Sequence, residues 1–405
     1  MPARSSYLRR LSLIIALLTA LLLGWYLGYQ GYGLSFSWGK VQVINREPPS
    51  GTETDLDLSL FWRVLGLLEN KYYDPSRLRG TDLLYGAVSG LVGSLNDPYT
   101  VFFTPEENKE FKQSLAGTYE GVGAQLGFLD HQLVIVAPLK NSPAERQGVK
   151  AGDAILEVDG VSTQGWSLAK AVASIRGEKG SEVNLKLGRQ QGEDGVVQIN
   201  LTIKREEIKI PCVALEWPEN KIAHLTLYRF GEDLQAEWAK AVSRIQEKGA
   251  EGLVLDVRNN PGGYLNGALI VGSEFFSEGN IVLKRAAGKT QEMGLDHKGK
   301  LTNIPLVVLV NEGSASASEI VAGAIQIRKR GMLVGGQTFG KGTVQEALDL
   351  DGGAGLHITV SDWLLPNGES IDGKGLLPDV EVELTDEDVS RGEDPQLKKA
   401  IELLK

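Results

Sequence analysis

The strongest constraint on the fold is a continuous apolar run, Pro305–Val310 (PLVVLV), that leads through a turn of small residues into a helical pattern. A run without polar alternation is typical of an inner strand covered on both faces of its sheet. Serines at positions 314, 316 and 318 are good N-cap residues, and Glu319 falls in the first helical turn, where the helix dipole favours an acid. The pattern predicts a strand, a tight turn and a helix, followed by a short strand and the glycine-rich loop GGQTFGKG.

The same order of elements occurs earlier in the chain. Leu253–Val257 (LVLDV) reads as an inner strand, RNNPGG as a sharp loop, and Tyr264–Phe276 as a helix. Alternating strands and helices predict an α/β sheet with helices on its faces. Asp256 and Arg258, at the start of the loop, are expected to brace it rather than to take part in chemistry.

A serine on a strand-to-helix turn is placed for nucleophilic chemistry. Free backbone N–H groups and the partial positive charge of the helix N-terminus stabilise an oxyanion that forms beside it. The chain has four histidines, and none lies in a motif typical of a triad partner. Lys341 of the GKG loop is the alternative base, because burial can lower the pKa of a lysine until it accepts a serine proton. In an extended segment Gln345 shares a face with Lys341 and can orient it.

The segments GSASASEIVAGA and GGQTFGKGTVQ resemble the C-terminal processing peptidases, a family of Ser–Lys serine proteases with an embedded PDZ domain. The resemblance implies that Ser316 is the nucleophile, that Lys341 is the base and that Gln345 assists the lysine. The SDWLL segment departs from the family pattern, so the resemblance does not determine which residues form the substrate groove.

The RNNPGG loop is a third motif of this family. It implies that Gly262 supplies one N–H group of the oxyanion hole and Ala317 the other, with Gly263 as a close alternative to Gly262.

The run Ala144–Gly160 resembles PDZ domains, and Ser167–Arg176 would be the helix beside their peptide groove. Such a groove binds an extended tail as an added strand and holds its carboxylate with backbone N–H groups of a glycine-rich loop. The loop expected to do so consists of Gly121, Val122, Gly123 and Ala124.

Residues 11–39 carry no Asp, Glu, Lys or Arg and follow three arginines. This pattern predicts one N-terminal transmembrane helix that acts as an uncleaved signal-anchor, with the N-terminus inside. The catalytic part would then lie outside the cytoplasm, in the periplasm, at the cell surface or in a thylakoid lumen. A cleaved signal peptide is the alternative, and the protein would then be secreted.

The predicted organisation is a signal-anchor (1–30), a linker (31–54), a helical region (55–111), a PDZ domain (112–205) and an α/β protease domain (206–405). The helical region includes a turn, Asn96–Thr100, that loosely resembles a family motif and is expected to serve packing or dimerisation. A homo-oligomer is possible.

Several classes of function are disfavoured. A net charge of −10 gives no basic field for nucleic acid, and one cysteine, Cys212, excludes an internal disulfide. Neither a metal site nor a cofactor is expected. The GGQTFGKG loop nearly spells a P-loop, but glycine stands where Ser or Thr would bind magnesium.

The predicted function is a serine endopeptidase that holds free apolar C-termini of protein or peptide substrates and cleaves near them. A non-catalytic PDZ scaffold and, more remotely, an acyl-CoA enzyme are the alternatives.

Overall fold

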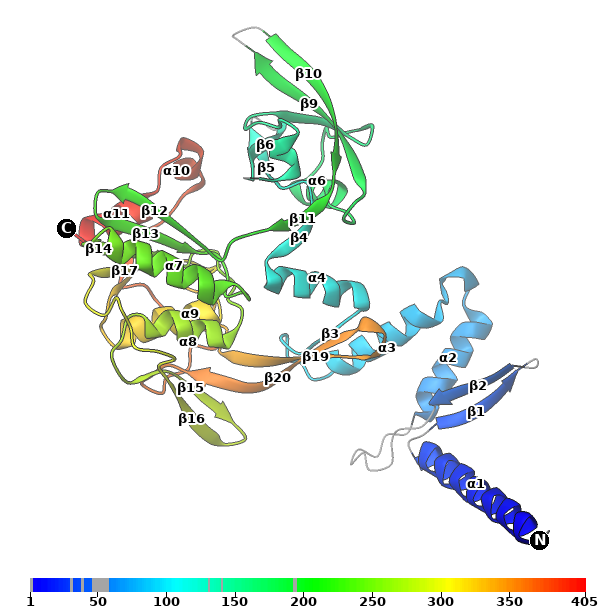
Figure 1. The fold of residues 1–405 in the computed structure, drawn as a ribbon. Helices are drawn as coiled ribbons and strands as arrows, with labels where there is room; N and C mark the ends of the chain where they lie inside the picture. Colours follow the sequence, from blue (N-terminus) through cyan, green and yellow to red (C-terminus); the bar gives the residue numbers. More distant parts are fainter. Residues whose placement is uncertain are drawn as a thin grey trace. The chain divides into compact units, whose positions relative to one another are not determined.

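The computed structural model describes residues 3–29, 32–37, 40–45, 58–129, 132–139, 141–191 and 195–405. It divides into two compact units, Met1–Leu83 and Leu84–Lys405 (Figure 1). The larger unit holds every residue expected to take part in chemistry.

The first unit begins with helix α1 (Ala3–Tyr29), followed by an antiparallel hairpin of β1 (Tyr32–Ser37) and β2 (Lys40–Asn45). This hairpin lies in the stretch interpreted as a linker, of which residues 46–54 are outside the described residues. Helix α2 (Ser59–Lys71) and the short η1 (Pro75–Arg77) follow. Within the described residues, no helix is both long and apolar enough to cross a membrane. The transmembrane helix therefore remains a prediction.

The core of the second unit is a six-stranded sheet in the order β12-β13-β14-β17-β18-β21. Its strands from β13 onward run parallel, and only β12 is antiparallel. Every residue of β14 and β17 is buried, which confirms the two inner strands predicted from their apolar runs. The bounds are β12 (Val213–Glu219), β13 (Ile222–Leu227), β14 (Gly252–Asp256), β17 (Leu306–Val310), β18 (Met332–Gly335) and β21 (Val380–Glu381).

Helices cover both faces of this sheet. Val308 and Val310 pack in one apolar cluster with residues of α7 (Leu234–Glu247), α8 (Leu265–Ser273) and α9 (Ala317–Ile327). Val307 and Leu309 point to the other face, where α11 (Pro395–Leu403) packs, and the short α10 (Asp386–Arg391) precedes it. The alternation of side chains along one strand thus fills two layers of the core.

A second sheet has the order β16-β15-β20-β19, and β3 pairs with β20. The register places Val101 of β3 opposite His357 of β20. The helical region predicted to precede the PDZ domain therefore contributes a strand to the catalytic part. The bounds are β3 (Val101–Phe103), β15 (Asn280–Ala286), β16 (Lys289–Gly294), β19 (Thr343–Asp349), η2 (Asp351–Gly353) and β20 (Gly355–Leu364).

Helices α3 (Gly80–Gly93) and α4 (Pro105–Ala116) flank β3 in sequence. Thr104 caps α4 through a capping box with Glu107, and Gly117 ends the helix at a φ of 65°. After this cap the chain enters the PDZ part.

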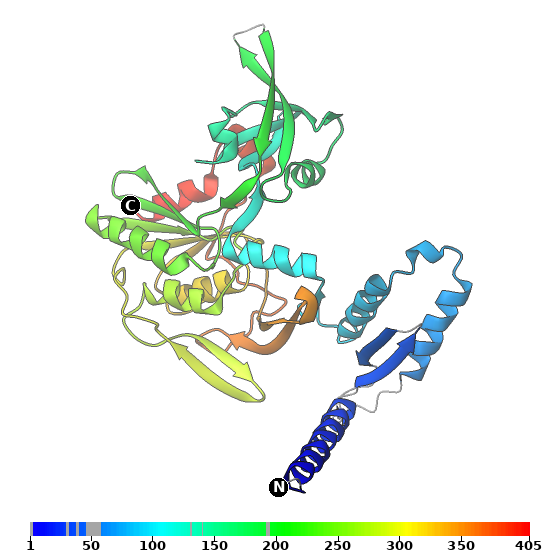
Figure 2. The same cartoon turned by 45° about the vertical axis from the view of Figure 1, so that its right-hand side comes forward.

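The PDZ part has its own apolar core and a sheet in the order β10-β9-β7-β6-β5, with β8 beside β7. Two antiparallel strands, β4 (Thr118–Gly121) and β11 (Glu206–Lys209), carry the chain into and out of it (Figure 2). We call this pair the stalk. The remaining bounds are β5 (Ala124–Leu129), β6 (Gln132–Pro138), α5 (Pro143–Arg146), β7 (Ala154–Val158), β8 (Val161–Ser162), α6 (Leu168–Ile175), β9 (Glu182–Gln191) and β10 (Gly195–Lys204).

Candidate active site

The turn before α9 holds three serines with different surroundings. The buried Ser314 and Ser318 donate their hydroxyls to Val257 O and Asn260 O, both at 2.8 Å, and so fasten the turn to the RNNPGG loop. Ser316 is half-buried, and among the described residues its Oγ donates no hydrogen bond. Of the three hydroxyls, only that of Ser316 is left available for chemistry.

The backbone of Ser316 adopts φ 54° and ψ −113°, a sparsely populated conformation for a residue with a side chain. Its N–H donates to Glu319 Oε2 at 2.9 Å. Such a conformation persists only where surrounding contacts hold it, and it is a feature of sharp strand-to-helix turns that present a nucleophile.

The RNNPGG loop lies directly beside this turn. A Cβ on Gly262, which has a φ of 100°, would come within 3.0 Å of both Ala317 N and Ser316 Cβ. The N–H of Gly262 is already used, because it donates to Asn260 Oδ1 at 2.9 Å. The N–H groups of Gly263 and Ala317 have no acceptor among the described residues. Gly263 rather than Gly262 therefore offers the second free donor.

Glu319 links the serine turn to the lysine loop. Its carboxylate is fully buried and accepts, besides the Ser316 N–H, the N–H groups of Gly340 at 2.7 Å and Lys341 at 3.0 Å. The Thr338 hydroxyl donates to it at 2.5 Å. Four donors thus converge on one carboxylate, so the Ser316 turn and the Lys341 loop are held in one hydrogen-bonded unit.

Lys341 lies half-buried in the loop before β19. Burial lowers the pKa of its ammonium group, against the carboxylate of Asp97, which raises it. Its Nζ is 4.9 Å from the ring centroid of Tyr99. No hydrogen bond among the described residues joins Nζ to Ser316 or Gln345, so the lysine expected to act as the base does not contact the serine expected to be the nucleophile through a hydrogen bond.

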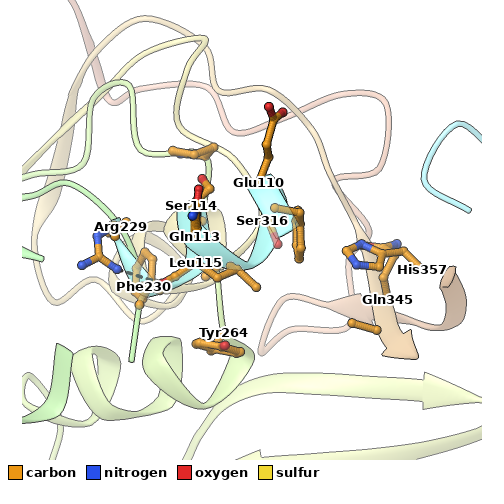
Figure 3. A pocket seen from close by; sticks show the side chains of 18 of the residues that line it. Glu110, Gln113, Ser114, Leu115, Arg229, Phe230, Tyr264, Ser316, Gln345 and His357 are labelled. Carbon is orange, nitrogen blue, oxygen red and sulfur yellow. Dashed lines mark hydrogen bonds between the residues drawn. The ribbon is translucent and has the colours of Figure 1, made fainter. Parts of the chain in front are cut away.

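Gln345 hydrogen-bonds two threonines instead of the lysine. Its Nε2 donates to Thr343 Oγ1 at 2.9 Å and to Thr359 Oγ1 at 3.1 Å. Ser316, Lys341 and Gln345 nevertheless line one cavity of about 1290 Å³. Figure 3 shows Gln345 beside His357 on one side of Ser316, with Arg229 and Phe230 on the other.

The turn Asn96–Thr100, interpreted as a packing element, also belongs to this cavity. Pro98 and Tyr99 line its wall, and Asp97 accepts the Thr100 hydroxyl at 2.7 Å. Trp363 of the SDWLL segment also lines this cavity, and its backbone N–H donates to Gly342 O at 2.9 Å. These two segments, whose part in the site the sequence did not determine, thus form part of the cavity that Ser316 lines.

The histidines do not form a triad with Ser316. His224 bonds Asp256 Oδ2 at 3.1 Å and His297 bonds Glu274 Oε2 at 3.1 Å, whereas His131 lies outside the described residues. His357 lines the cavity but packs between aromatic rings, and burial lowers its pKa, as does the charge of Lys341. Lysine thus remains the candidate base.

Asp256 and Arg258 brace the loop, as the sequence indicated. The Arg258 guanidinium bonds Asp256 at 2.6 Å and Asp394, at the start of α11, at 2.8 Å. Burial opposes ionisation of Asp256, but hydrogen bonds from His224 and Arg258 hold its pKa below the ordinary value. This ion-pair network ties α11 to the RNNPGG loop.

In the PDZ part, the loop Gly121–Ala124 leads from β4 into β5, an edge strand that contacts α6. The carbonyls of Val122 and Gly123 accept N–H groups of Ala144 and Leu139, both at 2.9 Å. Gly123 has a φ of 75°, and a Cβ there would lie 2.4 Å from Ser142 Cβ. The loop is fixed from one side and borders an unpaired strand edge.

Cys212 is fully buried and forms no disulfide, in agreement with the core position expected for it.

Comparisons with known proteins agree with this geometry. Residues 221–382 match Peptidase family S41, and residues 134–189 match a PDZ domain. The chain is 40% identical to the carboxy-terminal processing protease CtpA of Bacillus subtilis over 75% of its own length and 65% of that protein. It is 35% identical to CtpB of the same organism over 83% of its length and 70% of that protein. The chain belongs to peptidase family S41.

Within this family the chain is a serine-type peptidase with a PDZ domain, and its curated relatives are carboxy-terminal processing proteases, as the resemblance predicted. It spans 65% of the length of CtpA. A solved S41 protease structure from Bacteroides fragilis shares the fold, with a TM-score of 0.58 and 17% identity, over 89% of this chain and 99% of that one.

Proposed function

We propose that this peptidase cleaves protein substrates near their free C-termini through an acyl-enzyme on Ser316. The observation that carries the proposal is the buried Glu319 carboxylate, which holds the Ser316 turn and the Lys341 loop together at one cavity. The Ser316 hydroxyl donates no hydrogen bond among the described residues and lines this cavity, so its proton is available for transfer when Oγ attacks a substrate carbonyl.

Neutral Lys341 takes the proton of Ser316 Oγ as the Oγ–carbon bond forms, and it gives that proton to the leaving amine. Water then hydrolyses the ester by the reverse proton path. The free N–H groups of Gly263 and Ala317 stabilise the oxyanion, with Gly262 shaping the approach of the loop. Lys341 Nζ must first leave the Tyr99 ring and reach hydrogen-bond distance of Ser316.

The PDZ part supplies recognition of the substrate tail. The tail adds to β5 as an extra strand beside α6, and its carboxylate binds N–H groups of the loop Gly121–Ala124. A tail with apolar side chains fits such a groove, because alternate side chains of an added strand point toward the helix.

We also propose that α1 attaches the protein to a membrane, with the catalytic part outside the cytoplasm. Support comes from the 27-residue length of α1 and from the exposure of its large apolar side chains between residues 13 and 26. Sedimentation of the full chain with lipid vesicles, compared with a chain lacking residues 1–30, tests this attachment.

The activity is tested with the full chain and an unstructured protein that has an apolar C-terminus, free or amidated, by mass spectrometry of the fragments. We expect cleavage by the parent and by Ser314→Ala, none by Ser316→Ala, and slower cleavage of the amidated substrate. Ser314 is the matched control, because it lies in the same turn but is bonded to Val257 O.

Tail binding without cleavage in any variant would instead identify a scaffold. Equal cleavage by the parent and Ser316→Ala would show that another residue is the nucleophile.

A further inference from the structure

One arginine holds both ends of the stalk that carries the PDZ part. Arg229 follows β13, and its Nη1 donates to Leu115 O at 2.8 Å while its Nη2 donates to Ile210 O at 2.8 Å. Leu115 lies in the last turn of α4, just before β4, and Ile210 directly follows β11. A single guanidinium therefore fixes the chain where it enters the PDZ part and where it returns.

Two glycines form the slot for this guanidinium. A Cβ on Gly117 would lie 1.7 Å from Arg229 Nη2, and a Cβ on Gly231 would lie 1.8 Å from Nη1. The Arg229 Nε is buried and has no acceptor in the part of the chain that the structure describes. Arg229 thus lacks one hydrogen bond at Nε while both of its terminal nitrogens are bonded. The backbone around the guanidinium therefore determines where it lies.

The next residue, Phe230, holds the RNNPGG loop, which supplies Gly263 to the proposed oxyanion hole. Phe230 N–H donates to Gly262 O at 2.9 Å, and Phe230 O accepts the Tyr264 N–H at 2.9 Å. These two bonds bracket Gly263, which is paired with Phe230 as an isolated bridge. A Cβ on Gly263 would lie 2.3 Å from Phe230 O, so the two backbones are in direct contact. Arg229, which holds the stalk, and Phe230, which holds the backbone around Gly263, are therefore adjacent residues.

We propose that Arg229 is a positioning residue for the hydrolytic reaction, which couples the stalk of the PDZ part to the oxyanion loop. The stalk, Arg229 and the RNNPGG loop then move together. The Gly263 N–H keeps its direction only while Arg229 holds both ends of the stalk. The inference rests on the proposed function, in which Gly263 supplies an oxyanion donor. Arg229 and Gly263 line the same cavity as Ser316.

The test compares Arg229→Met with the parent. Methionine keeps much of the side-chain volume but removes both donors. Losing one oxyanion donor costs about 10²–10³ in rate, and a displaced donor should cost at least about tenfold in kcat. KM and the dissociation constant of a tail peptide should change by less than about twofold, because the PDZ groove itself is untouched. Arg229→Lys, which keeps a donor, should recover part of the lost rate.

Arg330→Met is the matched control. Its guanidinium also clamps backbone carbonyls, those of Phe275 at 3.1 Å, Leu301 at 2.6 Å and Ile304 at 2.7 Å, but it does not line the catalytic cavity. This variant should lose stability while kcat stays within about twofold of the parent. The comparison therefore separates loss of a clamp in general from loss of this clamp.

A peptide boronate supplies a readout specific to the oxyanion hole. The Ser316 Oγ–boron bond forms, boron becomes tetrahedral and negatively charged, and the serine proton passes to Lys341. The affinity of Arg229→Met for the boronate should fall by the same factor as kcat, whereas the affinity of Arg330→Met should not fall. Unchanged kcat in Arg229→Met, or equal losses of kcat in both variants, would overturn the inference. If Arg229→Met does not fold, Arg229→Lys with parental kcat and boronate affinity would overturn it equally.

A parent that neither cleaves the substrate nor binds the boronate would instead contradict the proposed function, on which this inference depends.

Discussion

Glu319→Gln is the sharpest test of how the site is assembled. In the parent, Oε1 accepts Thr338 Oγ1 and Gly340 N–H, and Oε2 accepts Ser316 N–H and Lys341 N–H. Glutamine replaces one of these oxygens by an NH₂ group, which cannot accept. The least harmful orientation places the NH₂ group toward Thr338, whose hydroxyl can accept from it, and leaves the Gly340 N–H buried without a partner.

An unsatisfied buried donor costs about 1–3 kcal/mol, so we expect Glu319→Gln to lower the free energy of unfolding by about that amount. The Lys341 loop loses its anchor in addition. A misplacement of a catalytic group by about 1 Å reduces rates by roughly 10²-fold, and we expect kcat to fall by about that factor. The measurements are urea unfolding followed by circular dichroism, and kcat on a substrate with a free C-terminus.

Glu237→Gln is the matched control for this change. Glu237 also lies in the first turn of a helix, α7, and accepts backbone N–H groups of Cys212 at 2.7 Å and Val213 at 3.3 Å. Both N–H groups donate to Oε2, which the amide oxygen of glutamine can replace, so Glu237→Gln should keep the parental kcat at little cost in stability. A Glu319→Gln variant that is as destabilised as expected yet retains parental kcat would refute the argument that this carboxylate positions the base.

Three further predictions concern the pKa of Lys341, the space around Gly262 and the ion pair between Arg258 and Asp256. Asp97→Asn should move the acidic limb of the pH profile of kcat/KM to lower pH, because the Asp97 carboxylate raises the pKa of Lys341 and its removal lowers that pKa; an unmoved limb would contradict Lys341 as the base. Gly262→Ala should reduce kcat by at least about 10²-fold at little change in KM, since its Cβ would lie 2.9 Å from Ala315 O and its φ is 100°; parental kcat would show that the loop has room. Arg258→Gln should lower the free energy of unfolding by roughly 3–5 kcal/mol, because it leaves Asp256 buried without its main partner; a loss below about 1 kcal/mol in denaturant unfolding would show that the network does not brace α11.

The sequence predicted those parts of the structure that local patterns determine. Apolar runs marked β14 and β17, and N-cap serines with an acid in the first turn marked α9. Ser316, Lys341 and Gln345, chosen from spacing and resemblance, line one cavity, and their roles remain to be tested.

Contacts between distant segments were not readable from those patterns. Glu319 was recognised only as an acid at a helix N-terminus, although the serine three residues before it is a capping-box signal. Its other partners, in the loop of Gly340 and Lys341, depend on how β18 and β19 are placed. Tyr99 reaches Lys341 only because β3 pairs with β20, and the Arg229 slot depends on glycines from two segments.

The pairing of β3 with β20 also bears on how this peptidase is made. Phe103 pairs with Gly355 near the far end of the chain, and a ribosome adding about 5–20 residues per second needs roughly 10–50 s to make the intervening segment. Before β20 is made, β3 has no strand to pair with, so Tyr99 and Asp97 are not yet held beside Lys341. Lys341 itself is made only shortly before β20. The surroundings of Lys341 are therefore completed only late in synthesis, after most of the second unit has been made.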